Sequence, residues 1–155
     1  MPGIFEIKCD HCDYQAVGTS YLAVLMPEGS EEICPHPGEI EHAERVTRER
    51  WATLIREKRI RYRYSLFCRE CGAVDYYGPD FPRNSTHLEN LVRTLTPEEA
   101  KMFRCRSCGK EGLFPFVWGD LWVGILEKTG LLQEIEVICP KCKTGKLTST
   151  MTGIS

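Results

Sequence analysis

The residues of this chain with the clearest chemical potential are its cysteines, because eight of the nine form four Cys-x-x-Cys pairs. The pairs are Cys9/Cys12, Cys68/Cys71, Cys105/Cys108 and Cys139/Cys142. Two thiolates at this spacing close on one metal ion with little ordering of the chain, and two pairs complete a tetrahedral four-thiolate site. The pattern therefore predicts two Zn²⁺ ions per chain, each in a closed shell that stabilises the fold and holds no catalytic water.

The four pairs do not by themselves fix which cysteines share an ion. Sequential pairing leaves the connections 13–67 and 109–138, whereas an interleaved, cross-brace pairing needs the longer connections 13–104 and 72–138. Loop-closure entropy favours the sequential arrangement by roughly 1 kcal/mol. We therefore expect Cys9, Cys12, Cys68 and Cys71 to bind the first ion, and Cys105, Cys108, Cys139 and Cys142 to bind the second.

Each pair lies between two short runs that are rich in alternating, β-branched or aromatic residues, which predicts the tip of an antiparallel hairpin. Gly72 and Gly109 follow the second cysteine of their pairs, where a positive φ lets the turn wrap around a metal. Two such turns facing each other across one ion resemble the zinc-ribbon, or rubredoxin-like, class. The resemblance covers the four pairs and their flanking strands, and it leaves iron with an electron-transfer role as an alternative to zinc.

The predicted fold is a small metal-bound α+β protein with two zinc ribbons in tandem. The first ribbon spans residues 1–80 and carries a helical insertion over about 39–60, where apolar residues form an imperfect stripe. A helical connector follows over 81–99, and the second ribbon spans 100–155. A shorter helical insertion is expected over about 120–129, beginning at Asp120 and ending before Gly130.

The ninth cysteine stands apart in the segment ICPHPGEIEH. Cys34 with His36 provides a possible additional metal site, or a nucleophile with its base in a redox or hydrolytic enzyme. The alternative is a structural turn, because Pro35, Pro37 and Gly38 interrupt regular structure and Cys34 has the character of a small buried residue.

The segment 56–69 is strongly basic and is a possible nucleic-acid contact through Arg56, Lys58, Arg59, Arg61 and Arg63. If a strand begins near Ile60, Arg61 and Arg63 share one face while Tyr62 and Tyr64 share the other, so the strand can hold phosphates and stack bases. The alternative is a structural role for these charges, since the segment 1–33 carries six acids against one lysine.

Composition and charge limit the functional classes. A hydrophobic content of 42% and a charged content of 27% are typical of a globular protein, and no apolar run is long enough to cross a bilayer. The net charge of −2 becomes about −6 with two zinc–thiolate centres, which opposes general attraction to nucleic acid. We therefore predict a cytoplasmic zinc-binding scaffold or adaptor that presents a surface to another macromolecule, with a protein partner preferred over nucleic acid and no membrane partner. The oligomeric state is left open.

Overall fold

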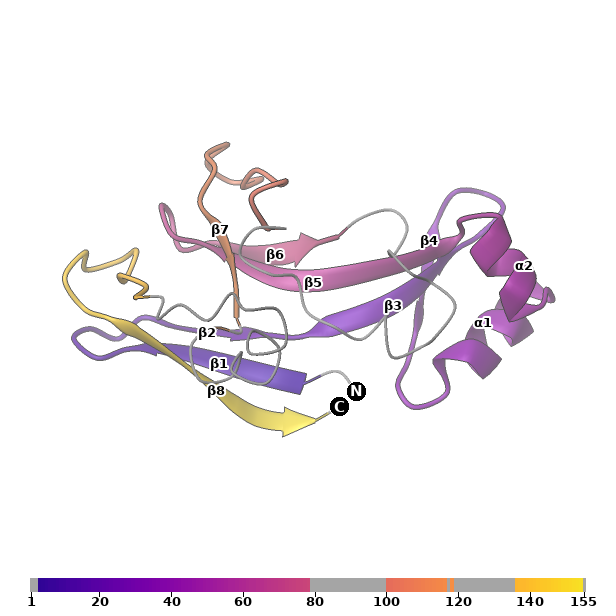
Figure 1. Cartoon of the computed structure of the whole chain (residues 1–155), viewed down its shortest axis with the longest axis horizontal. Coiled ribbons are helices and arrows are strands. Elements are labelled where there is room, and N and C mark those ends of the chain that lie inside the picture. Colours follow the sequence, from indigo (N-terminus) through magenta and orange to yellow (C-terminus); the bar gives the residue numbers. More distant parts are fainter. Residues whose placement is uncertain (1–2, 79–99, 117, 119–135, 155) are drawn as a thin grey trace, which may run out of the picture.

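The computed structural model describes residues 3–78, 100–116, 118 and 136–154, which form mostly antiparallel β sheets and two helices. The molecule is elongated (Figure 1). Four loops that carry the Cys-x-x-Cys pairs lie at one end, and the two helices lie at the other. The predicted α+β class with short antiparallel strands is confirmed at this level.

A three-stranded sheet joins the two ends of the chain. β1 (Gly3–Cys9) lies between β2 (Gln15–Gly18) and β8 (Leu147–Ile154), and both neighbours run antiparallel to it. The β1–β8 register places Cys9, at the end of β1, opposite Leu147, at the start of β8. The first and last Cys-x-x-Cys turns therefore lie at the same end of these two strands.

The second sheet has five strands arranged around β5 (Ile60–Cys68). Its order is β4 (Glu31–Cys34), β3 (Ser20–Leu25), β5 and β6 (Val74–Tyr77), and β7 (Leu113–Pro115) also pairs with β5. β5 begins at the residue expected from the sequence. Because Cys68 lies opposite Leu113, β7 brings the third Cys-x-x-Cys loop next to the second.

The helical insertion consists of two helices rather than one helix over 39–60. α1 spans Glu39–Thr47 and α2 spans Trp51–Arg56. Arg48 ends α1 in the left-handed conformation, with φ of 58°. Backbone N–H groups at the break find side-chain acceptors nearby, because Glu49 N donates to Thr47 Oγ1 at 3.3 Å and Trp51 N donates to Glu44 Oε2 at 3.0 Å. The insertion predicted over about 39–60 is therefore interrupted between α1 and α2.

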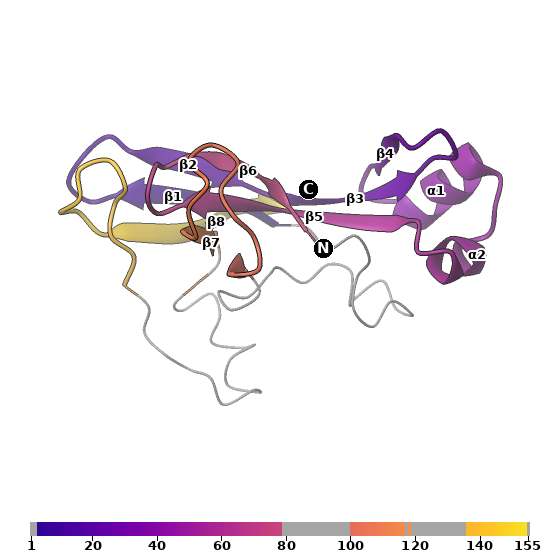
Figure 2. The ribbon, with the colours of Figure 1, turned by 90° about the horizontal axis from the view of Figure 1, so that it is seen from above.

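Two apolar cores lie on opposite faces of β5. Tyr62, Tyr64 and Leu66 belong to the core beneath α1 and α2, whereas Phe67 belongs to the core shared with the three-stranded sheet. In this second core Phe67 contacts an aromatic group from the other half of the sequence, formed by Phe114, Phe116 and Trp118. The first and second halves of the chain are thus packed against each other around β5, as Figure 2 shows from above.

Two predicted helical segments, the connector over 81–99 and the insertion over 120–129, lie outside the described residues, so they and the domain boundaries stay predictions. Within the described ranges, no helix has the length and apolar character needed to cross a bilayer.

Candidate metal centres

The structure brings the eight paired cysteines together as two groups of four, but not in the expected combination. One group, named here the outer centre, joins the first and last pairs: Cys9, Cys12, Cys139 and Cys142. The other, the inner centre, joins the two middle pairs: Cys68, Cys71, Cys105 and Cys108. The pairs are therefore nested. The sequential assignment of ligands is wrong, because β1 pairs with β8 and β5 pairs with β7.

Sulfur–sulfur distances in both groups fit a tetrahedral metal site. In the outer centre Cys9 Sγ lies 3.7 Å from Cys142 Sγ, and Cys12 Sγ lies 3.6 Å from Cys139 Sγ. In the inner centre, each of the pairs Cys68/Cys108 and Cys71/Cys105 is 3.6 Å apart between sulfurs. A Zn–S bond of about 2.3 Å in a tetrahedron requires neighbouring sulfurs about 3.8 Å apart, whereas a disulfide requires about 2.05 Å. Both groups therefore fit one ion each and do not form disulfides.

Backbone amides of the first and last turns point at the sulfurs. In the first turn His11 N and Cys12 N donate to Cys9 Sγ at 3.3 and 3.4 Å. In the last turn Gly145 N donates to Cys142 Sγ at 3.2 Å. N–H donors stabilise a thiolate over a thiol, so each turn is prepared for an ionised ligand before any metal binds.

Three of the four turns use a left-handed residue directly after the second cysteine. Gly72 and Gly109 have φ of 78° and 75°, which confirms the role inferred for these glycines. Lys143 takes the same position in the last turn with φ of 64°. Sequence reasoning missed Lys143, because nothing in a lysine indicates a positive φ.

Two thiols of the outer centre differ widely in pKa. Backbone N–H groups of Thr144 and Gly145 lower the pKa of Cys142 to about 6. For Cys12 the amide of Tyr14 lowers the pKa, but burial and the neighbouring thiols outweigh it and raise the pKa to about 12. One sulfur thus ionises readily while its neighbour resists a second negative charge. A divalent cation held by Cys9, Cys12, Cys139 and Cys142 would remove this conflict by stabilising all four thiolates together.

The two centres contact each other directly. Tyr14 Oη, from the outer centre's first turn, donates to Gly72 O of the inner centre at 3.1 Å. Lys143 Nζ donates to Glu70 O, also at 3.1 Å. A Cβ atom added to Gly72 would lie 3.2 Å from the Tyr14 ring, so the turns are already in close contact. Nothing in the sequence pattern indicated this contact.

The possible additional site at Cys34 and His36 is not assembled as a metal site in the described part of the chain. The Cys34 side chain is buried, with 2% of its surface exposed, and burial followed by the charges of Glu32 and Glu39 raises its pKa to about 12. His36 Nδ1 lies 2.5 Å from Glu39 Oε1. These contacts favour the structural interpretation of the segment.

We expect Cys34→Ser to leave the zinc content unchanged and to lower the free energy of unfolding by about 1 kcal/mol, as is usual for a small change in a core. Elemental analysis and denaturant unfolding measure the two effects. Loss of a whole zinc equivalent would instead show that Cys34 is a ligand.

Three of the five predicted nucleic-acid contacts form ion pairs within the protein. Arg59 pairs with Glu49 and Glu57, and Arg63 lies 2.5 Å from Glu31, to which Arg61 is also close at 3.9 Å. The predicted division of β5 is confirmed, with Tyr62 and Tyr64 buried and the arginines on the opposite face. Arg56 and Lys58 precede the strand in the sequence and are exposed. Nucleic-acid binding by the five residues stays a prediction.

Comparisons with protein-family models, with curated proteins and with solved structures find no match to this chain. The class of the molecule therefore rests on its own geometry, which is that of a small α+β protein, mostly antiparallel sheet, with two four-cysteine groups compatible with zinc-ribbon-like metal sites.

Proposed function

We propose that this chain is a cytoplasmic zinc-binding scaffold in which two structural Zn²⁺ ions hold a β framework together for contact with another macromolecule. The observation that supports it most strongly is the set of sulfur–sulfur distances of 3.6 to 3.7 Å in both groups. When bound, each ion would supply charge neutralisation and cross-linking. The cysteines of the outer centre would tie the two ends of the chain, and those of the inner centre would tie β5 to β7.

A structural role for the ions follows from the closed ligand sets. Four protein thiolates complete the tetrahedral shell that zinc prefers in structural sites, which leaves no position for substrate or water. Iron is the alternative for the same sulfur geometry and would give an electron carrier. A protein partner is our prediction from the sequence. The exposed large hydrophobic residues do not identify where such a partner would bind, because they lie on six different segments of the described chain: Val17, Ile33, Val74, Met102, Ile138 and Met151.

We expect protein purified without added metal to contain about two zinc ions per chain, because both groups have the ligand number and spacing of a structural zinc site. Chelation should unfold it, since apparent binding energies of ~10–16 kcal/mol per ion exceed the usual stability of a small domain. Elemental analysis and circular dichroism before and after chelation provide the measurement. A red protein containing iron would contradict the structural-zinc proposal.

A further inference from the structure

The end of the molecule formed by α1, α2 and the residues after them, named here the helical end, carries four basic residues directed to solvent. They are Arg48, Arg50, Arg56 and Lys58, all exposed. Within the described part of the chain, none of these four side chains has an ion pair or hydrogen bond, in contrast to Arg59, Arg61 and Arg63 of the neighbouring strand. Their charge is therefore available to a partner.

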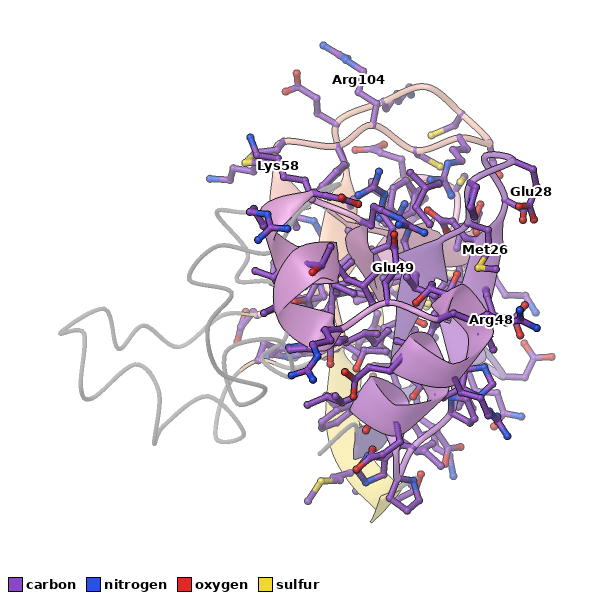
Figure 3. The ribbon with its side chains drawn as sticks, turned by 90° about the vertical axis from the view of Figure 1, so that its right-hand side faces the viewer. Met26, Glu28, Arg48, Glu49, Lys58 and Arg104 are labelled. Carbon is purple, nitrogen blue, oxygen red and sulfur yellow. The ribbon has the colours of Figure 1, made fainter. Side chains whose placement is uncertain are left out.

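Most acidic residues of the same segment form hydrogen bonds or ion pairs with other residues of the protein. Glu39 pairs with His36, Glu44 accepts the Trp51 amide and Glu49 pairs with Arg59. Glu41 and Glu57 are exposed, and Glu57 lies 3.3 Å from Arg59. Glu28 of the β3–β4 hairpin also lies at this end and is exposed (Figure 3), so acids and bases are similar in number here. Among the exposed residues of this end that form no ion pair within the described chain, the four cations outnumber the acids Glu28 and Glu41.

Two of the four basic residues occupy backbone conformations that a long side chain disfavours. Arg48 has φ of 58° at the end of α1, and Lys58 has φ of 57° after α2. Glycine or asparagine adopts this region more easily, so a charged residue there lowers stability. Since neither side chain forms a hydrogen bond or ion pair within the described residues that offsets this cost, we attribute the presence of both residues to their positive charge.

The negative charge of the metal centres is too far away to cancel this positive surface. β5 runs from Ile60, beside the helical end, to Cys68 of the inner centre. Nine residues of strand span about 27 Å at ~3.4 Å per residue, which is more than three times the Debye length of about 8 Å at physiological ionic strength. The overall negative charge therefore does not prevent an anion from approaching the helical end.

We propose that the helical end binds the phosphate backbone of double-stranded nucleic acid, independently of sequence. The inference rests on the proposed scaffold function, and it takes nucleic acid as the macromolecule in place of the protein partner predicted from the sequence. Three of the four cations are arginines, which hold phosphates in a bidentate manner. Arg48 and Lys58 lie at opposite sides of this end (Figure 3), as contact with phosphates on both sides of a groove requires.

The surroundings of these cations favour a duplex over other anionic partners. Trp51 packs against the core and is partly buried, so it offers less of its ring for stacking on the bases of a single strand than an exposed aromatic side chain would. Neither helix carries one of the exposed large hydrophobic residues that insertion into a lipid surface would use. Phosphate contacts alone then determine the affinity, which makes binding weak and strongly salt-dependent.

The test uses the full zinc-bound chain and a fluorescent mixed-sequence DNA duplex of about 20 base pairs. Four phosphate contacts predict a slope of about −3.6 in log affinity against log salt, or an affinity loss of about 150-fold between 50 and 200 mM salt. The test variant combines R48N, R50Q, R56Q and K58N, with asparagine at the two left-handed positions so that the fold is retained. This variant should lose the salt-dependent binding.

A charge-matched control removes four exposed cations from the metal end through K8Q, R104Q, K110Q and K146Q, and it should retain the slope. Equal loss in the control, no duplex binding by the unmodified chain, or tighter binding to vesicles with anionic lipid than to the duplex would each overturn the inference. Zinc content separates the two proposals. Two zinc ions without duplex binding refute the inference alone, whereas duplex binding without two zinc ions refutes the structural-zinc proposal alone.

Discussion

Replacing Cys12 and Cys139 together with serine is expected to remove one zinc ion per chain and to leave the other bound. These two sulfurs are 3.6 Å apart in the outer centre, so both substitutions affect the same ion. The inner centre keeps all four of its thiolates. Because a structural zinc site needs four protein ligands and only two thiolates remain at the outer centre, the loss should be complete rather than partial, and elemental analysis after dialysis measures it.

The matched comparison replaces Cys12 and Cys71, which also removes two thiolates but takes one from each centre. This variant should lose both ions. If ions were instead shared by sequential pairs, the outcomes would be exchanged: the Cys12/Cys71 variant would keep one zinc and the Cys12/Cys139 variant would keep none. Because both variants remove two thiolates, the difference in their zinc content depends on which cysteines share an ion, and it therefore tests the nested arrangement directly.

The ligand types were predictable from the sequence because Cys-x-x-Cys is a local pattern with a direct chemical reason. Which pairs share an ion was not predictable, because loop-closure entropy separates the possible pairings by only about 1 kcal/mol. The nested arrangement has one very long connection, 13–138, and one short connection, 72–104. Relative to sequential pairing, these cost only about 0.8 kcal/mol. The hydrogen-bonded ladders of β1 with β8 and of β5 with β7 contribute more free energy than this small difference in loop closure, so they determine which cysteine pairs meet.

Those ladders are difficult to identify in the sequence because β8 is rich in threonine and serine. The pattern of LTSTMTGI indicates a strand but does not indicate which strand it joins. The central strand β5 of the other sheet was easier to predict, since its alternation of basic and aromatic residues defines two faces. Arg48 illustrates the same limit for helices, because an arginine in the left-handed conformation ends α1 without a glycine to mark the position.

Gly145→Ala is expected to abolish zinc binding at the outer centre while the inner centre keeps its ion. A Cβ atom at this position would lie 2.3 Å from Cys9 Sγ and 2.8 Å from His11 Cβ, far inside van der Waals contact. Gly145 cannot move away easily, because its N–H donates to Cys142 Sγ at 3.2 Å and its carbonyl accepts from Cys139 N at 2.8 Å. The added methyl group therefore displaces either a ligand or the turn that positions two ligands.

The control for this substitution is Gly153→Ala in β8, where the nearest atom to an added Cβ is Ile4 Cδ1 at 3.6 Å, an ordinary contact. Both variants add one methyl group close to β1, but only the first adds it beside a metal ligand. We expect one zinc per chain for Gly145→Ala and two for Gly153→Ala by elemental analysis. Two zinc ions in both variants would show that Cys9 does not ligate at this position, since the added methyl group would overlap Cys9 Sγ where the structure places it.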